Sequence, residues 1–325
     1  MAEQKIGTVT LVRELSPMLA IFRVTPGEGG VFPEYRGGQY IALSRNDCRL
    51  TRRIPDEAGG PRYVYELDEN GHPKRGTVTH AYSIASAPFE SRRGGYLEFY
   101  VVLEMIESEM PGRLSESLFH AGSSPDHHLM YQDTVAGNFT LEDRAAGFRN
   151  VVFVGTGTGL APFASMIKQV HHDARRNAAR VRYTLLHANR TREELGYHEE
   201  LLEIERQGRF DFAYVPSISR PGKSIGADDS VGAGRANNLL RGILGMPLKE
   251  EEDLLRAGSA EMALARSGLA AAVRPVLPRH HSREQLLDRM DPADTVIMAC
   301  GNVHLREDVL AIAAAAGMRF EQEEW

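Results

Sequence analysis

Glycines in the middle of the chain have the spacing of a phosphate-binding turn. In VVFVGTGTGLAPF, Gly155, Gly157 and Gly159 follow an apolar run and precede a helix-forming segment, which is the context that such a turn requires. Glycine lets backbone N–H groups approach an anion closely, and the positive end of a helix attracts it. Leu160 replaces the last glycine of the GxGxxG motif, and the Gly-Lys-Ser/Thr ending of an ATPase loop is missing. The stretch predicts a nucleotide site, with an ordinary tight turn as the alternative.

Cationic side chains follow the next two expected strands. The segments HANRTREE and PSISRPGK contain His187, Asn189, Arg190, Arg192, Ser217, Ser219, Arg220 and Lys223. Open parallel sheets bind ligands at the carboxyl ends of their strands, where an acid would accept the 2′-hydroxyl of NAD and cations suit the 2′-phosphate of NADP. The first acid here is Glu193, so NADP is the predicted nucleotide. Solvated surface arginines are the alternative.

The elements that must position these residues change in type near residue 150. Before it, short segments rich in β-branched and aromatic residues are separated by Gly, Pro and Asn, and one helix is expected at 112–122. After it, apolar strands alternate with helical segments, which is typical of a parallel sheet wrapped by helices. We predict an antiparallel β-barrel at 1–146, with a sandwich as the alternative, and an α/β nucleotide-binding domain at 147–325.

Composition excludes several classes of protein. Hydrophobic and charged residues make up 42% and 25% of the chain, as in ordinary globular proteins, and the net charge of -6 argues against nucleic-acid binding. Cys48 and Cys300 alone cannot form a four-thiolate metal site. No apolar run reaches signal-peptide or membrane-spanning length. The sequence therefore predicts a cytoplasmic protein with no membrane partner.

Two stretches fit neither domain pattern. Residues 45–62 are expected to form an exposed loop in which Arg45, Arg49, Arg52 and Arg53 either steer an acidic partner or are simply solvated. Residues 242–282 are rich in Ala, Glu and Arg and are helix-prone. This insertion could be a flap, an oligomer contact or a partner-specific surface.

Five ordered motifs resemble those of the ferredoxin–NADP(+) reductase family. They are HAYSIAS (80–86), GTGTGLAPF (155–163), SISR (217–220), ACGN (299–302) and the terminal EEW. The resemblance spans both domains and leaves only the two stretches above unmatched. It implies an FAD-binding β-barrel followed by an NADP-binding α/β domain.

The resemblance implies roles at the reacting centre, and the predicted catalytic residues are Ser83, Cys300, Glu323 and Trp325. Tyr82 would lie along the isoalloxazine ring, and Ser83 near flavin N5, the hydride acceptor. Cys300 would be a wall beside the nicotinamide, or else a structural cysteine. Glu323 would relay a proton, or else lie exposed in an acidic tail. Trp325, the only tryptophan, would cover the other ring face as a displaceable lid.

The remaining predicted contacts follow from the same motifs. Those for FAD are His80, Ala81, Tyr82, Ser83, Ser86, Tyr100, Val101, Gly112, Arg113, Leu114, Ser115 and Trp325. Those for NADP are Gly155, Thr156, Gly157, Thr158, Gly159, Asn189, Arg190, Ser219, Arg220, Arg235, Cys300 and Gly301. No metal ligand is predicted, since the pairs His127–His128 and His171–His172 are expected on a loop and on a helix surface.

His80 departs from the family pattern, which has an arginine that pairs with the FAD pyrophosphate. An imidazole cannot replace a bidentate guanidinium. Arg113, beside Gly112 and Ser115 in a second phosphate-binding turn, is the predicted replacement. FMN is the alternative cofactor.

The predicted function is that of an FAD-dependent oxidoreductase that moves electrons between NADPH and a one-electron carrier by hydride transfer to flavin N5. The expected carrier is an acidic ferredoxin or flavodoxin, and a monomer is favoured. The alternatives are an NAD(P)H-dependent reductase component of an oxygenase system and a flavin-free binding or regulatory homologue.

Overall fold

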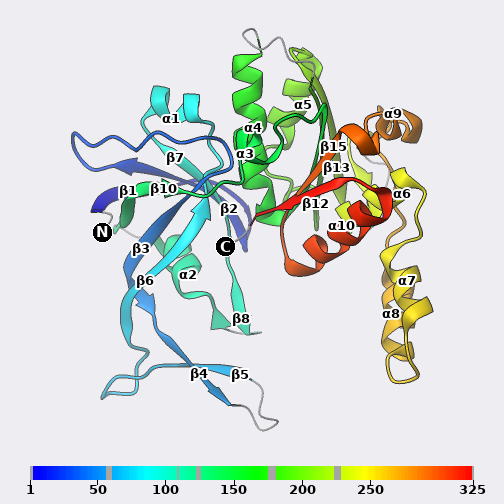
Figure 1. The fold of residues 1–325 in the computed structure, drawn as a ribbon. Coiled ribbons are helices and arrows are strands. Elements are labelled where there is room, and N and C mark those ends of the chain that lie inside the picture. The colour runs from blue at the N-terminus through cyan, green and yellow to red at the C-terminus, as the bar shows by residue number, and fades with distance from the viewer. Residues whose placement is uncertain are drawn as a thin grey trace. The chain divides into compact units, whose positions relative to one another are not determined.

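The computed structural model describes residues 3–55, 61–107, 110–121, 126–174, 181–222 and 228–323. The chain divides into two units, Met1–Gly137 and Asn138–Trp325 (Figure 1). The second unit begins before the expected boundary at 146/147, because α3 (Leu141–Arg144) is held by it. Arg144 Nη1 donates to Glu321 Oε2 at 3.0 Å. No helix among the described residues is long and apolar enough to cross a membrane.

The first unit is built on an antiparallel sheet of six described strands in the order β6-β3-β10-β1-β2-β7. Their bounds are β1 Gln4–Ser16, β2 Leu19–Pro26, β3 Tyr40–Arg49, β6 Arg75–Ser83, β7 Leu97–Val102 and β10 His128–Ala136, and the helices are α1 Pro88–Gly94 and α2 Arg113–Ala121. β8 (Met105–Glu107) pairs antiparallel with β9 (Met110–Pro111). The apolar core packs Phe22, Leu43 and Phe99 together with Leu114 of α2, which excludes water from the inner face.

The expected loop at 45–62 is wrong where the structure describes this stretch, because residues 45–49, 51–55 and 61–62 lie in strands. Residues 56–60 lie outside the described residues. β3 continues to Arg49, and β4 (Thr51–Pro55) pairs antiparallel with β5 (Pro61–Tyr65). Arg45 is only 3% exposed. Its guanidinium contacts Asp47 Oδ2 at 3.0 Å, and its Nε donates to Ser117 Oγ at 2.7 Å. From the sequence alone, a charged residue that is buried in an ion pair cannot be distinguished from an exposed one.

The second unit is built on a parallel sheet of six described strands in the order β14-β13-β12-β11-β15-β16. The strands are β11 Asn150–Thr156, β12 Arg182–Asn189, β13 Asp211–Ile218, β14 Gly232–Ala233, β15 Thr295–Cys300 and β16 Arg319–Gln322. The helices include α4 Leu160–Asp173, α5 His198–Gln207, α6 Ala236–Leu244, α9 Arg283–Leu287 and α10 Val303–Ala316. Figure 1 shows α4 and α5 on one side of this sheet and α6 and α10 on the other. The predicted two-domain fold class is confirmed.

Burial on both faces explains the apolar run of β11. Successive strand residues point to opposite faces. Val152 and Val154 join a core with α6 and α10, while Phe153 packs on Phe163 of α4 with ring centroids 4.8 Å apart. A polar side chain on either face would therefore be buried without water, which would lower the free energy of unfolding.

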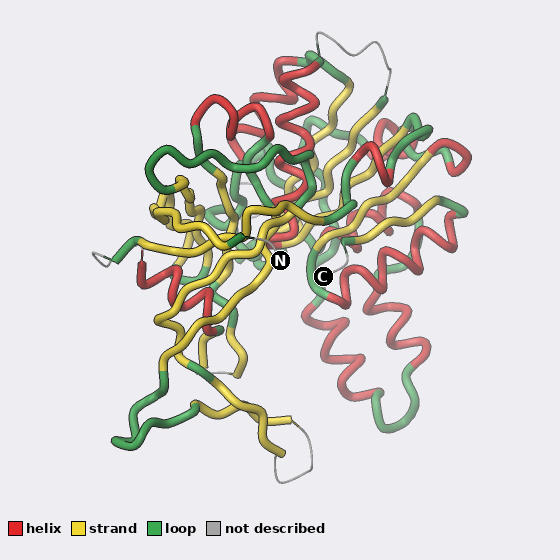
Figure 2. The backbone as a smooth tube through the Cα atoms, turned by 60° about the vertical axis from the view of Figure 1, so that its left-hand side comes forward, coloured by secondary structure: helices red, strands yellow, loops and turns green. Residues whose placement is uncertain are grey.

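The helix-prone insertion contains α7 (Lys249–Arg256) and α8 (Met262–Ala271). Figure 2 shows them as two adjacent helices joined by a short loop. Of α7 only Glu250 is buried, and no residue of α8 is. The insertion is therefore attached to the second unit mainly through the start of α7.

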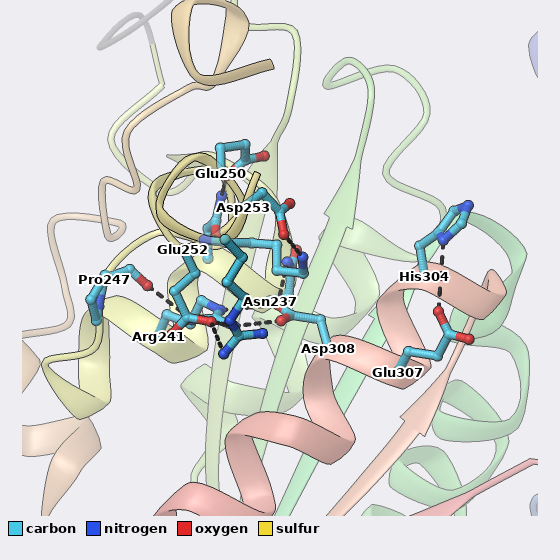
Figure 3. A network of polar contacts seen from close by, with 12 residues as sticks. Asn237, Arg241, Pro247, Glu250, Glu252, Asp253, His304, Glu307 and Asp308 are labelled. Carbon is cyan, nitrogen blue, oxygen red and sulfur yellow. Dashed lines mark hydrogen bonds and ion pairs between the residues drawn. The ribbon is translucent and has the colours of Figure 1, made fainter. Parts of the chain in front are cut away.

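A buried polar network forms this attachment (Figure 3). The Arg241 side chain of α6 is 3% exposed and the Asp308 side chain of α10 is 1% exposed. Arg241 Nε donates to Asp308 Oδ2 at 3.0 Å, and its Nη1 donates to Glu252 Oε1 of α7 at 2.8 Å. Asn237 Nδ2 also donates to Asp308 Oδ2, at 2.7 Å. One guanidinium thus joins α6, α7 and α10.

Candidate functional site

The structure gives a different steric reason for glycine at each of the three positions of the predicted phosphate loop. A Cβ on Gly155 would lie 3.2 Å from the Phe163 ring, and one on Gly159 would lie 2.2 Å from the carbonyl oxygen of Cys300. Gly157 has a φ of +56°, and nothing lies within 4 Å of its added Cβ. Gly155 and Gly159 therefore permit close packing, whereas Gly157 supplies left-handed backbone beside open space.

This loop has the features of an anion cradle. β11 ends at Thr156, a single 3-10 turn covers Gly157–Gly159, and the 14-residue helix α4 begins at Leu160. The N-terminus of a helix carries unpaired N–H groups and a partial positive charge. Open space at Gly157 next to that terminus fits a nucleotide phosphate.

Residues after β12 and β13 lie side by side beyond the sheet. Ser219 N and Oγ both reach Asn189 O, at 2.8 and 3.2 Å, and Arg220 N donates to Arg190 O at 2.9 Å. Asn189 uses its own side chain to hold the loop, since its Nδ2 donates to Glu194 O at 2.6 Å. These four predicted residues are therefore brought together at the carboxyl edge, where Asn189 has a structural task.

The arginines at this edge differ in availability. Arg190 Nε pairs with Glu194 at 3.0 Å, and Arg192 pairs with Asp228 at 2.6 Å and Glu199 at 3.0 Å. Arg220 is exposed, and its guanidinium has no partner among the residues that the structure describes. Arg220 is therefore the cation best able to bind a 2′-phosphate.

Arg235 lies at the start of α6, just after β14, and the preceding Gly234 N donates to Ile218 O at the carboxyl end of β13 at 2.9 Å. Arg235 Nη1 donates to Glu250 Oε1 of the insertion at 3.3 Å, and its side chain is 67% exposed. Glu250 also accepts from Asn238 at 2.8 Å. An anionic ligand of Arg235 would compete with Glu250.

Cys300 and Glu323 form a buried pair. Cys300 ends β15, and its Sγ donates to Glu323 Oε2 at 2.8 Å. Glu323 is 2% exposed, so it is not the exposed tail residue of the alternative reading. Burial and the Glu323 carboxylate raise the pKa of Cys300 well above its usual value. The thiol is therefore neutral and suits a small apolar wall.

Gly301 follows Cys300 at the carboxyl edge and has a φ of +150°. An added Cβ would lie 2.5 Å from Thr156 Oγ1. β15 and β11 thus bring Cys300 and Gly301 next to the glycine loop. Trp325 and Lys223 lie outside the described residues.

Candidate flavin residues lie in the first unit. β6 exposes His80 and Ala81, half-buries Tyr82 and buries Ser83. Tyr82 meets Phe99 edge to face with ring centroids 6.4 Å apart. A Tyr ring fixed in this way fits the flat surface of a flavin.

The second predicted phosphate turn begins α2. Ser115 Oγ donates to Gly112 O at 3.1 Å and accepts from Glu104 N at 3.1 Å. Leu114 packs into the core at 1% exposure. Arg113 is half-buried, and its guanidinium has no partner within the described part of the chain. Arg113 therefore fits the role of a cation for an anionic ligand at this turn.

Three of the predicted flavin contacts have side chains that are buried in the interior of the first unit. Ser86 is fully buried, and its Oγ accepts from Glu98 N at 3.0 Å. Tyr100 and Val101 are 3% and 1% exposed. Their side chains stabilise the unit, so a ligand could reach these positions mainly through backbone atoms.

His187 was expected among the nucleotide residues, but its side chain lies in the interior. It is fully buried on β12, with Nδ1 3.1 Å from the Tyr214 hydroxyl. His198 Nδ1 is 3.4 Å from the same hydroxyl. The Nε2 atoms of both histidines lack a hydrogen-bond partner among the described residues. Burial lowers the pKa of His187 to about 3, and it lowers the pKa of His198 as well.

The free energy of unfolding should fall as the pH drops from 6.5 toward 3. In this range the unfolded chain binds a proton on His187 that the folded chain excludes. At pH 5 the loss is about 2 kcal/mol for this residue. Urea unfolding of His187→Phe at pH 7 and pH 5 should show a weaker pH dependence than the wild type. The exposed-residue control His72→Phe should retain it, and an unchanged dependence in His187→Phe would contradict the assignment.

Comparison with known proteins adds to this geometry. Residues 153–267 match the family model of the oxidoreductase NAD-binding domain. A flavodoxin/ferredoxin–NADP reductase from Rhodobacter capsulatus is 28% identical over 197 residues, which are 60% of this chain and 56% of that protein. The chain is thus similar to a ferredoxin–NADP reductase in sequence, and its second unit carries the match to the NAD-binding domain. The family resemblance seen in the sequence is confirmed, and the match spans just over half of the curated relative.

Two solved structures share the fold across nearly the whole chain. A ferredoxin–NADP(+) reductase from Neisseria gonorrhoeae, solved with bound FAD and NADP, has a TM-score of 0.57 and 19% identity and covers 99% of each chain. The ferredoxin reductase in carbazole 1,9a-dioxygenase has a TM-score of 0.54 and 13% identity, over 99% of this chain and 69% of that one. At these identities the likeness concerns the fold.

Proposed function

We propose that this protein moves electrons between NADPH and a one-electron carrier protein with FAD as its resident cofactor. The observation that carries the proposal is the glycine loop with open space at Gly157, next to Cys300 and Gly301 on the adjoining strand. When bound, FAD supplies the hydride acceptor at N5 and allows two electrons to leave one at a time. The residues of the chain bind and orient the reactants.

In the second unit, the start of α4 binds the nucleotide pyrophosphate through backbone N–H groups. Arg220 binds the 2′-phosphate and selects NADPH over NADH. Cys300 provides a neutral wall for the nicotinamide, and the hydrogen bond from its thiol holds the carboxylate of Glu323.

In the first unit, Tyr82 and Ser83 would hold the isoalloxazine ring, with Tyr82 supplying an aromatic surface for it. Arg113 and the backbone of Gly112 bind the FAD phosphates in place of the family arginine at His80. The exposure of His80 and the availability of Arg113 support this assignment.

An acidic ferredoxin or flavodoxin is the proposed carrier. Arg52 and Arg53 of β4 are exposed and would supply the attraction. Arg45 is buried and Arg49 is paired with Glu116, so neither belongs to the proposed docking surface. A cytoplasmic location and a monomeric state stay predictions.

Anaerobic titration with NADPH, followed by visible spectroscopy, tests this function. We expect a yellow protein that bleaches with NADPH far more readily than with NADH. Arg220→Ala should raise the NADPH concentration for half-reduction about tenfold or more, because a charge-assisted contact is lost, and should change NADH little. Arg206→Ala, an exposed arginine on α5, is the control.

Each outcome of that titration has a distinct meaning. A colourless protein that gains no flavin spectrum when FAD is added would overturn the reductase proposal and favour a flavin-free homologue. Equal loss with NADPH and NADH in Arg220→Ala would reject its role at the 2′-phosphate. Reoxidation of the bleached protein by ferredoxin or flavodoxin would separate a carrier reductase from an oxygenase component that requires another acceptor.

A further inference from the structure

Three potential metal ligands converge in the second unit, away from the glycine loop. They are Glu205 on α5 and the neighbouring residues His280 and His281, which precede α9. One ligand atom from each lies within 4.8 Å of the other two. Glu205 Oε2 is 3.3 Å from His280 Nε2, and Glu205 Oε1 is 3.2 Å from His281 Nε2.

The backbone directs both imidazoles to one carboxylate. His281 N donates to Pro278 O at 3.1 Å, which closes a turn over residues 278–281. Within it the two rings lie with centroids 4.2 Å apart. Neighbouring residues of an extended chain point in opposite directions, so this turn gathers two nitrogen ligands that an extended chain would separate.

The spacing suits a small divalent cation. Tetrahedral zinc with its usual bond lengths holds ligand atoms about 3.4 Å apart, and two histidines with one carboxylate leave its fourth position open to water. The side chains of Glu205 and His281 are 16% and 11% exposed, whereas that of His280 is 38% exposed. The ligand set is thus mostly sheltered, with solvent access on the His280 side.

Two of the three residues also bind the backbone of β13. Glu205 Oε1 accepts from Tyr214 N at 2.8 Å, and His281 Nε2 lies 2.9 Å from Tyr214 O. At Tyr214, β13 pairs with β12, and its pairing with β14 begins only at Ser217. These contacts orient Glu205 and His281 and explain their own burial. They do not explain why His280 joins the same carboxylate.

The Glu205 carboxylate faces both imidazoles, with Oε2 toward His280 and Oε1 toward His281. A negatively charged oxygen beside two imidazoles is a hard-and-borderline ligand set of the kind that zinc accepts.

We propose that Glu205, His280 and His281 form a zinc-type divalent-cation site that ties α5 to the segment before α9. The cation takes His281 Nε2 from its contact with Tyr214 O and joins it to His280 Nε2 and one oxygen of Glu205. Water fills the remaining position. The site is separate from hydride transfer, so it stabilises the second unit and leaves NADPH-dependent reduction unchanged.

Zinc titration of the chelator-treated, dialysed full-length protein tests the proposal, with a competing chromophoric chelator and thermal unfolding as readouts. We expect one saturable zinc site and a rise in Tm with zinc. His280→Ala should weaken zinc binding about tenfold or more and remove the rise in Tm. His304→Ala, an exposed histidine at 91% side-chain exposure, should bind zinc as the wild type does.

His280→Ala is preferred to a change at His281 or Glu205, because those residues also bind the backbone of β13. Its Tm without zinc should equal that of the wild type, which checks the fold. No saturable binding, or equal zinc affinity in His280→Ala, would overturn the site. The NADPH bleaching test fails or succeeds independently of this result.

Discussion

Gly159→Ala is expected to lose about 3 kcal/mol or more of unfolding free energy and to abolish NADPH-dependent reduction. The added Cβ would lie 2.2 Å from Cys300 O, 2.5 Å from Cys300 C and 2.8 Å from Gly301 N. These are backbone atoms, so no side chain can move to relieve the overlap. The carboxyl ends of β11 and β15 must separate, and both the predicted nicotinamide wall and the phosphate loop would shift. Urea unfolding and flavin bleaching measure the two effects.

Two other glycines provide matched controls. Gly157 and Gly208 share a φ of +56°, and neither has an atom within 4 Å of its added Cβ. Alanine at either position should cost about 1 kcal/mol for left-handed backbone. Only Gly157→Ala should also weaken NADPH binding, because Gly208 follows α5. If Gly159→Ala were as stable as Gly208→Ala, the close approach to Cys300 would be refuted.

Arg241→Met is expected to cost about 3–5 kcal/mol of unfolding free energy. Asp308 would keep a carboxylate in a side-chain position that is 1% exposed, and the Asn237 amide would be its one remaining side-chain partner among the described residues. The Asp308 and Glu252 carboxylates hold the pKa of Arg241 above its already high value, so the guanidinium is charged at any working pH. Denaturant unfolding at neutral pH measures the loss.

A surface arginine of the same network is the control. Arg256 reaches Glu252 at 3.5 Å with 75% side-chain exposure, and Arg256→Met should change stability by about 0.5 kcal/mol or less. Adding Asp308→Leu to Arg241→Met should recover much of the loss, because the unpaired buried charge is removed. Equal stability of the two single variants would mean that the buried pair contributes little.

The elements that could be predicted are those whose burial shows in the residue types. β11 and β15 are apolar on both faces, and the glycines between β11 and α4 mark a tight turn, so strand, loop and helix follow from local rules. The central strands of the second unit's sheet, β11, β12, β13 and β15, were therefore predictable, whereas the short edge strands β14 and β16 were not. Cys300 and Gly301 could be placed at its carboxyl edge by the same reasoning.

The features that could not be predicted depend on long-range pairing. The sequence predicts that Arg45 is exposed. In the structure its side chain is buried, and its guanidinium contacts Asp47 and Ser117. His187 lies near the end of a strand that leads to predicted site residues, but its side chain turns inward to Tyr214. Glu205 and His280 are far apart in sequence, and only the path of the chain before α9 brings them together. Local periodicity carries no information on such contacts.

Because the insertion is attached mainly through α7 and Arg241, α8 can unfold locally at a lower free energy than the central strands of the sheet. No side chain of α8 is buried, whereas the central residues of β11 and β15 are at 0–1% exposure. Amide hydrogens of α8 are thus protected by little more than helix formation, which is marginal for ten residues. Those of the central strands exchange only when the whole unit unfolds. α8 therefore opens separately from the sheet, and its residues can change with little effect on the stability of the central strands.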